Sequence, residues 1–415
     1  MEPGSTTTVD VDDIRAAAAV VTPVVKHTPV VASVSLSDSC GGTVVLKAEN
    51  LQVTGAFKIR GATNKLAALK RDGHVTGVTA ASAGNHALAL ASAARAAGVP
   101  CEIFVPIGAP VTKIEAAESF GASIHEVAAT LEEAFAAAVE RAQSAGYALC
   151  HPFDDPAVIA GQGTLGLELL DDVADLTTVV VPLGGGGLAA GVAIALKSHL
   201  PHVRIVGVQA AACAPYAGSE AAAGPIPTLA DGIAVKHPGL VTGPLVERWL
   251  DDVVTVDEES IADAMVLLME RAKLYVEGAG AVGVAALLSG AVEPAEQGAT
   301  CVVLSGGNVD LGVVPGLIRR HETEAGRRLV VFATIDDRPG GLAKLLSVFG
   351  AAGANLIAVE HLREGVNLHV RETEVHCTFE VRGPDHSSAI ITAARDAGYR
   401  NLRVDSPTGT GRPLT

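Results

Sequence analysis

Short apolar segments that alternate with longer helical patterns limit this chain to a small set of folds. Strands buried on both faces give continuous apolar runs, because neither face of the sheet meets water. The alternation therefore predicts an α/β fold in which parallel sheets are covered by helices on both faces. The predicted strands are 75–80, 101–105, 122–127, 177–182, 203–209 and 300–304, and the predicted helices are 10–22, 85–97, 112–120, 131–145 and 188–200.

The sequence changes character near residues 319–328, where charged side chains predominate. After this stretch the patterns follow the order strand, helix, strand, strand, helix, strand, which is the order of a ferredoxin-like βαββαβ unit. These elements are predicted over 329–335, 340–352, 355–361, 374–381, 387–397 and 402–404. We therefore expect a first domain over 1–320 with a smaller subdomain at roughly 55–150, a linker over 321–328, and a small domain over 329–404.

Charge and cysteine content exclude several classes of protein. The net charge is −16, with 46 acidic against 30 basic residues, which repels nucleic acid and anionic membranes. The six cysteines form no CxxC or CxxxC pair, so we expect buried thiols in a reducing compartment. No apolar run reaches the length of a membrane span, and the polar, acidic N-terminus is unlike a signal peptide. We expect a cytoplasmic protein.

A run of four glycines, Gly184 to Gly187, follows a predicted strand and opens a helix at Leu188. Backbone amides of such a loop can surround a phosphate, and the helix N-terminus adds partial positive charge. The alternative is a flexible turn. Because the loop lacks the GxGxxG spacing and the P-loop lysine, a single phosphate is the better interpretation.

Two further loops follow buried strands, at the edge where parallel sheets bind ligands. In the first, Ser82, His86 and the loop amides can hold a carboxylate, and Asn85 can bind a ring hydroxyl; helix capping by Ser82 or Asn85 is the alternative. In the second, Ser305 can donate to a heterocyclic nitrogen, although an ordinary glycine-rich turn explains the same residues.

Lys58 follows Phe57 in a stretch of small residues. An amine becomes a nucleophile when its surroundings lower its pKa, whereas most lysines are solvated and inert. A reactive lysine, a phosphate loop and polar groups at strand ends together indicate a phosphorylated aldehyde cofactor, for which pyridoxal phosphate is the best candidate.

With these motifs the chain resembles the fold-type II pyridoxal-phosphate enzymes, and within them the threonine ammonia-lyases (threonine dehydratases). Residues 329–404, with the sequence Asp337-Arg338-Pro339-Gly340 before one helix and Gly353-Ala354-Asn355 after it, resemble an ACT domain. The matching motifs of the first domain occur in the family's order at 54–62, 82–87, 184–188, 230–233, 277–281 and 305–308.

The resemblance implies a role for each matching residue. Lys58 would be the Schiff-base lysine and the base that removes the substrate's Cα proton. Phe57 would pack beside the cofactor ring, and Asn85 would contact its 3-hydroxyl. Ser82, Asn85 and His86 would bind the substrate. The phosphate would be held by Gly184, Gly185, Gly186, Gly187 and Leu188, and the ring nitrogen by Ser305.

Two departures refine this expectation. Serine racemases of the family carry a second serine where this chain has Ala83, so two-base racemisation lacks its partner and elimination is favoured. Related enzymes often bind a divalent cation through a glutamate where this chain has Gln209. Because Gln209, Cys213 and Pro215 are poor ligands for a hard cation, we predict no metal there, or only a monovalent ion.

The expected activity is deamination of L-threonine to 2-oxobutanoate and ammonia, with some L-serine activity, as a step towards isoleucine or in threonine catabolism. The alternatives are an L-serine or 3-hydroxyaspartate ammonia-lyase, an inactive amino-acid sensor and, disfavoured by the missing GxGxxG, a nicotinamide oxidoreductase. For the ACT-like domain we expect control by a branched-chain amino acid, isoleucine first, or else support of a homo-oligomer (a dimer or tetramer).

Overall fold

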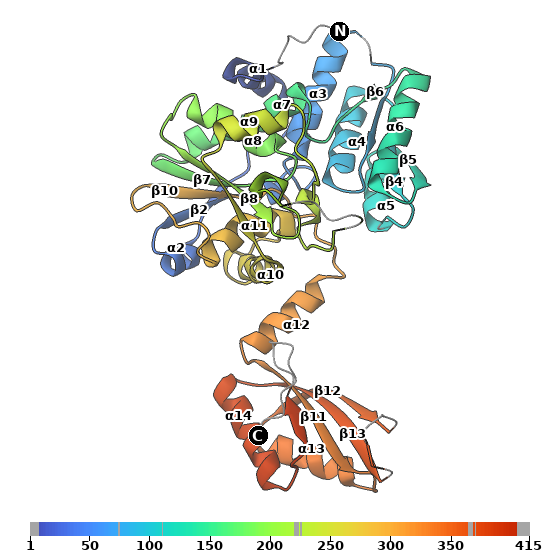
Figure 1. The fold of residues 1–415 in the computed structure, drawn as a ribbon, viewed down its shortest axis with the longest axis vertical. Helices are drawn as coiled ribbons and strands as arrows, with labels where there is room; N and C mark the ends of the chain where they lie inside the picture. The colour runs from blue at the N-terminus through green and yellow to red at the C-terminus, as the bar shows by residue number, and fades with distance from the viewer. Residues whose placement is uncertain are drawn as a thin grey trace. The chain divides into compact units, whose positions relative to one another are not determined.

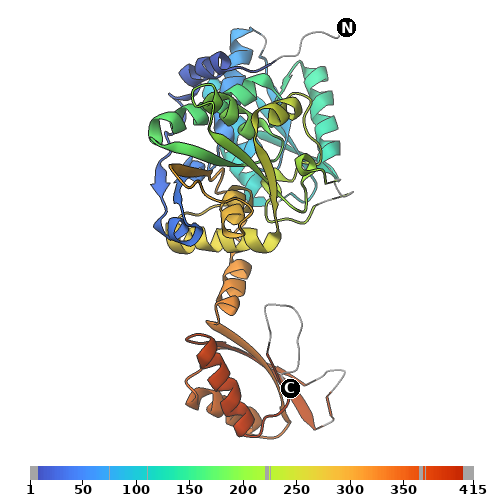
Figure 2. The same ribbon diagram turned by 60° about the vertical axis from the view of Figure 1, so that its left-hand side comes forward.

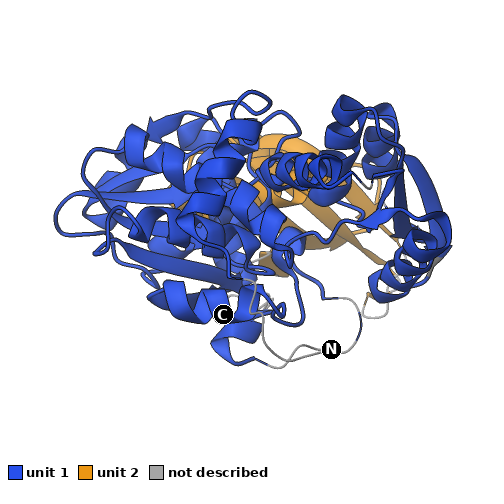
Figure 3. Ribbon diagram, turned by 90° about the horizontal axis from the view of Figure 1, so that it is seen from above, with its two compact units in different colours: residues 1–309 blue, residues 310–415 orange. Residues whose placement is uncertain are grey.

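The chain forms two compact units, residues 1–309 and 310–415 (Figure 3). The structure is a computed structural model and describes residues 8–73, 75–109, 111–219, 224, 226–363, 368–369 and 371–404. The boundary between the two units, at residue 309, falls before the predicted linker 321–328. The first part of the charged stretch 319–328 belongs to helix α12 (Val314–Glu324) of the second unit. This helix packs on β11 (Arg328–Asp336) of the second unit.

The larger sheet of the first unit has six strands in the order β1-β2-β10-β7-β8-β9. All neighbours are parallel except β1, which runs antiparallel to β2. The central strands are almost wholly buried, as their apolar sequences predict. The strand bounds are β1 (Val30–Ala32), β2 (Thr43–Lys47), β7 (Leu176–Pro182), β8 (Arg204–Ala210), β9 (Asp252–Val256) and β10 (Ala299–Val303).

A smaller, wholly parallel sheet has the order β5-β4-β3-β6 and is packed by α4, α5 and α6 (Figure 1). The two separate sheets, parallel except at the edge strand β1, confirm the predicted α/β fold class. The strands of the smaller sheet and the helices packed on it are β3 (Val78–Ala81), α4 (Asn85–Ala97), β4 (Cys101–Pro106), α5 (Val111–Ser119), β5 (Ser123–Ala128), α6 (Leu131–Ala145) and β6 (Ala148–Leu149).

Close helix contacts replace aromatic packing in the first unit. A Cβ atom on Gly161 would lie 2.7 Å from the Arg60 carbonyl oxygen, and one on Gly191 would lie 2.7 Å from the Gly163 nitrogen. The backbones of α3, α7 and α8 therefore meet almost directly, and only glycine fits at these positions. The remaining helices are α1 (Val11–Val21), α2 (Val34–Cys40), η1 (Glu49–Leu51), α3 (Lys58–Arg71), α7 (Pro156–Asp172), α8 (Gly187–Lys197), η2 (Pro215–Ala217), η3 (Asp231–Ile233), α9 (Thr242–Trp249), α10 (Glu258–Leu267), the π-helix η4 (Leu268–Ala272) and α11 (Gly278–Leu288).

The second unit has the predicted ferredoxin-like order. Its antiparallel sheet runs β12-β13-β11-β14, with the first strand in the middle. Figure 2 shows this sheet beside the helices of the second unit, in orange and red. The predicted inward face of β13 is buried, and Phe379 packs 4.7 Å from Phe349 between ring centroids. The other elements are α13 (Gly341–Ala351), β12 (Asn355–Leu362), β13 (Glu372–Glu380), α14 (Pro384–Asp396) and β14 (Leu402–Val404).

All six cysteines are free thiols. Five are buried, and Cys40 at the end of α2 is half-buried. Burial raises the pKa of Cys101, Cys150 and Cys301 to about 12 and that of Cys377 to about 11. Among the described residues, no helix combines the length and apolar character that crossing a bilayer requires.

Candidate active site

Lys58 is the first residue of α3 and lies half-buried. Its Nζ donates to the carbonyl oxygen of Pro152 at 2.9 Å and lies 5.1 Å from the centroid of the Phe57 ring. Burial lowers the pKa of Lys58 to about 8, although the nearby Glu277 opposes this change. About a tenth of the amine is therefore unprotonated at pH 7, far more than for a solvated lysine.

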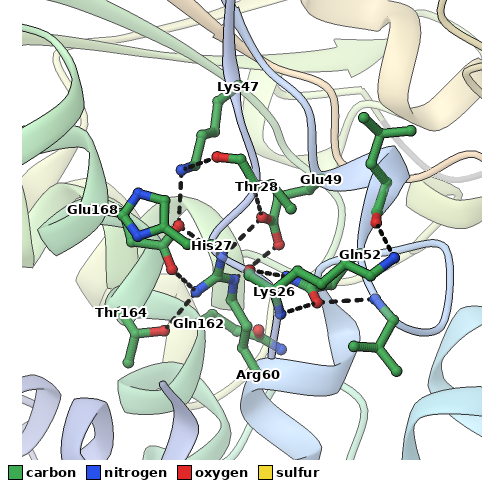
Figure 4. A network of polar contacts seen from close by, with 12 residues as sticks. Lys26, His27, Thr28, Lys47, Glu49, Gln52, Arg60, Gln162, Thr164 and Glu168 are labelled. Atoms are coloured by element: carbon green, nitrogen blue, oxygen red, sulfur yellow. Dashed lines mark hydrogen bonds and ion pairs between the residues drawn. The ribbon is translucent and has the colours of Figure 1, made fainter. Parts of the chain in front are cut away.

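A cluster of buried charges fixes the first turn of α3 (Figure 4). Arg60 uses all five guanidinium N–H groups, at distances of 2.7–3.2 Å, to bind Glu49, Glu168 and Thr164. Lys47 pairs with Glu168 at 2.7 Å. The lysine loop, residues 52–57, lies between Glu49 and Arg60, which are bonded to each other. Because Arg60 also binds Glu168 on α7, the cluster connects both ends of the lysine loop to that helix.

The four glycines join β7 to α8. Gly186 has a φ of +93°, which side chains rarely adopt, and a Cβ on Gly185 would lie 2.2 Å from the Phe153 ring. The Gly185 carbonyl accepts a 3.3 Å bond from the Tyr216 hydroxyl. The first amides of α8 have no partner within the helix, so the loop can bind an anion.

Pro152 and Phe153 connect this loop to Lys58. The carbonyl oxygen of Pro152 accepts a hydrogen bond from the Lys58 amine, and the ring of Phe153 packs on Gly185. Asp154 then accepts the backbone amides of Leu240, Val241 and Thr242 at 2.9 Å. This segment has no distinctive signature in the sequence, because prolines and aspartates are typical of any turn before a helix.

Asn85 begins α4, as predicted, and lies between two side chains from distant parts of the sequence. Its Nδ2 donates to Glu277 Oε1 at 2.7 Å, and its Oδ1 accepts from Asn308 Nδ2 at 2.7 Å. Glu277 is 6% exposed, and burial raises its pKa to about 7. Glu277 and Asn308 lie in motifs that match the family, but the resemblance alone gives neither of them a role.

Ser82 and His86 flank the same loop. Ser82 Oγ accepts the Gly84 amide at 3.2 Å, which leaves its own hydrogen free to donate. The buried His86 ring donates through Nε2 to the Cys150 carbonyl at 2.9 Å, and burial, with the charge of Lys58, lowers its pKa to about 3. The single N–H of this neutral ring is used inside the protein, so His86 gives a substrate carboxylate neither charge nor a hydrogen bond in this arrangement.

Ser305 follows β10 and is buried. Its carbonyl accepts the Phe57 amide at 3.0 Å, and Ala56 forms a bridge with Gly306. The structure thus places the Ser305 loop directly against the lysine loop.

Gln209 on β8 is fully buried and its amide is engaged. Nε2 donates to the Leu183 carbonyl at 3.2 Å, while Oε1 accepts the amides of Tyr216 and Ala217 at 3.0 and 3.2 Å. The oxygen that could face a cation is therefore occupied by backbone donors.

These features fit a phosphorylated aldehyde, because an anion-binding glycine loop and an amine of depressed pKa are joined through Pro152 and Phe153. The chain belongs to the pyridoxal-phosphate dependent enzyme family, whose model matches residues 21–306. It is 44% identical to an L-threonine ammonia-lyase of Geobacter sulfurreducens, over 90% of this chain and 94% of that protein. An L-threonine ammonia-lyase of Thermotoga maritima is 41% identical, over 94% of this chain and 98% of that protein.

Two solved structures also superpose on much of this chain. A threonine deaminase from T.th. superposes with a TM-score of 0.68 at 37% identity, covering 73% of this chain and 99% of that one. Maize serine racemase superposes with a TM-score of 0.70, also at 37% identity, covering 76% of this chain and 98% of that one.

Proposed function

We propose that this enzyme deaminates L-threonine to 2-oxobutanoate and ammonia with pyridoxal phosphate, and also converts some L-serine to pyruvate. The observation that carries the proposal is the Lys58 amine of lowered pKa, held 2.9 Å from the Pro152 carbonyl beside the glycine loop. The relatives that match nearly the whole chain are named L-threonine ammonia-lyases, which supports this substrate.

The cofactor supplies an aldehyde for the amine and a ring that withdraws electrons from the substrate's Cα. Lys58 is the attachment point and the base at Cα, because burial makes its amine available near neutral pH. Phe57 would pack beside the ring, Asn85 would bind the 3-oxygen and Ser305 would bind the ring nitrogen. Gly184 to Gly187 and Leu188 would bind the phosphate.

Ser82 and the first amides of α4 bind the substrate carboxylate, since a helix N-terminus favours an anion. His86 supports this loop through Cys150. Loss of the Cα proton and the β-hydroxyl removes water from threonine, and hydrolysis of the released product returns water and frees ammonia.

The test is incubation of the holoenzyme with L-threonine, with 2-oxobutanoate and ammonia measured together. Lys58→Ala should abolish both products, whereas Lys65→Ala, a change in the same helix, should leave measurable turnover. Normal turnover by Lys58→Ala would refute the proposal.

Racemisation is the second activity to test, because maize serine racemase is among the similar structures. Ala83 has no group that can deliver a proton to the second face of Cα. We therefore expect L-serine to yield pyruvate and no D-serine. The ratio of kcat/KM for threonine, serine and 3-hydroxyaspartate separates the related lyase activities.

We also propose that the second unit binds a branched-chain amino acid. A cleft of about 540 Å³ in this unit is lined by aliphatic side chains and by side chains of both signs of charge, which suits an aliphatic zwitterion. Asp337 and Arg363 lie 3.6 Å apart at this cleft. The other lining residues include Ile335, Asp336, Arg338, Leu342, Leu346 and His361.

Isoleucine is the first effector to test in the full-length enzyme. Arg363→Ala should raise the isoleucine concentration of half-maximal effect about tenfold, the change expected for one lost contact with a carboxylate. An unchanged response would refute this site. We further propose a cytoplasmic homo-oligomer, a dimer or tetramer, which light scattering of the purified chain tests directly.

A further inference from the structure

The orientation of the Asn85 amide is fixed from both sides by residues that the proposed function leaves without a role. Asn308 Nδ2 lies 2.7 Å from Asn85 Oδ1 on one side, and Glu277 Oε1 lies 2.7 Å from Asn85 Nδ2 on the other. The three side chains come from residues 85, 277 and 308, so only the folded chain brings them together.

A backbone carbonyl fixes the first of these side chains. Asn308 Nδ2 also donates to the Thr54 carbonyl at 3.0 Å, so both of its hydrogens are used. The side chain fits because residue 55 is glycine: a Cβ there would lie 2.5 Å from Asn308 Oδ1, and φ is +75°. The start of the lysine motif, Thr54-Gly55, therefore holds Asn308.

Reversing the Asn85 amide would break both contacts. Its Nδ2 would then face Asn308 Nδ2, placing two donors together, and its Oδ1 would face the Glu277 carboxylate, placing two acceptors together. Since buried polar groups without partners are costly, only the observed orientation satisfies all three side chains.

The observed orientation leaves one hydrogen of Asn85 Nδ2 for a ligand, since the other is donated to Glu277. We propose that Glu277 and Asn308 are positioning residues that make Asn85 a hydrogen-bond donor, and thereby favour the deprotonated 3-oxygen of the cofactor. This inference rests on the proposed function, in which Asn85 contacts that oxygen.

The test measures cofactor affinity and the pH midpoint of the bound cofactor's visible absorption band. Asn308→Asp replaces the donor by an acceptor of the same shape. The matched control is Asn50→Asp, which removes the 3.0 Å hydrogen bond from Asn50 Nδ2 to the Tyr275 carbonyl. Asn50 packs against Gly307, which is next to Asn308 in the chain.

Asn308→Asp should weaken cofactor binding about ten- to hundredfold, the range expected when a hydrogen bond to a charged oxygen is lost. It should also move the midpoint of the absorption band upward by about one pH unit or more, because the anionic oxygen loses its donor. Asn50→Asp should lower the melting temperature of the apoenzyme but leave the midpoint in place.

A double variant separates positioning from stability. In Asn308→Asp with Glu277→Gln, the Asn85 amide can reverse, since the introduced glutamine can donate to it and the introduced aspartate can accept from it. We expect a higher apoenzyme melting temperature than for Asn308→Asp alone, but no recovery of cofactor affinity.

Equal behaviour of Asn308→Asp and Asn50→Asp would overturn the inference, as would recovery of affinity together with stability in the double variant. If the unaltered enzyme bound no cofactor and made no keto acid, the proposed function would fail first, and this inference with it.

Discussion

Arg60→Met should destabilise the first unit by about 3–5 kcal/mol, because it leaves a buried carboxylate without its cation. Arg60 and Glu49 are both 0% exposed, and two bonds of 2.8 Å join them. Burial by itself raises the pKa of Glu49, but the charges of Arg60 and Lys47 and the hydrogen bonds from Arg60 and Thr28 together hold it below its ordinary value. The loss is large against a typical total stability of about 5–15 kcal/mol.

The chain offers a specific probe for this measurement. Trp249, the single tryptophan, lies on α9 in the first unit, so its fluorescence reports on the unfolding of that unit. With a urea slope of about 3 kcal/mol/M, the midpoint should fall by roughly 1–1.7 M. The matched control is Arg204→Met, which breaks an exposed pair with Asp252 and should cost less than about 1 kcal/mol.

The pH dependence has a definite sign. The pKa of Glu49 is lower in the folded state than in the unfolded chain, where it is near 4.5. The ion pair therefore stabilises the fold fully at pH values above the unfolded pKa, and this stabilisation is lost as the pH falls through the folded pKa. The difference between the unaltered enzyme and Arg60→Met should therefore shrink in acid. A loss no larger than that of Arg204→Met at neutral pH, or a difference that grows in acid, would refute the argument.

Three further predictions concern the site. Attachment of the cofactor to apoenzyme, followed by absorbance, should speed up with a midpoint near pH 8, because only the unprotonated Lys58 amine reacts; a rate still rising steeply at pH 9.5 would contradict this. Gly185→Ala should weaken cofactor binding at least tenfold, since its Cβ would overlap Phe153, whereas Gly243→Ala, with an ordinary contact of 3.6 Å, should bind normally in the same titration. Extensive treatment with EDTA should leave the deamination rate unchanged, because backbone amides occupy the Gln209 oxygen; loss of activity that Mg²⁺ restores would show a cation site.

Segments with strong local patterns could be predicted from the sequence. The bounds of α4, α6 and β14 agree with the prediction, because Gly98 and Gly146 end the two helices in the left-handed conformation. Helix α1 begins after Asp10, inside the predicted helix 10–22, and Asp10 and Asp13 form a capping box there.

Helix α7 had no predicted counterpart, although it spans Pro156–Asp172. Glycines at 161, 163 and 166 lower its helical propensity, so local preference argues against a helix there. The same glycines are required by close contacts with α3, α1 and α8. Tertiary packing thus decides this segment, and a single sequence does not contain that information in local form.

The site shows the same limit. Lys58 and the glycine loop have local signatures, whereas Glu277 acts on a residue 192 positions away. His86 looked like a carboxylate ligand beside Ser82, and only the fold shows that its N–H is directed at Cys150. Contacts between distant segments depend on topology, which local patterns do not specify.

The distribution of thiols makes the enzyme suitable for single-site labelling. Five of the six cysteines are buried, so a maleimide dye should react first with Cys40 at the end of α2. A fluorophore there sits on the connection between β1 and β2, at one edge of the larger sheet. The natural sequence thus offers one attachment point for fluorescence measurements of cofactor loading without any cysteine being removed.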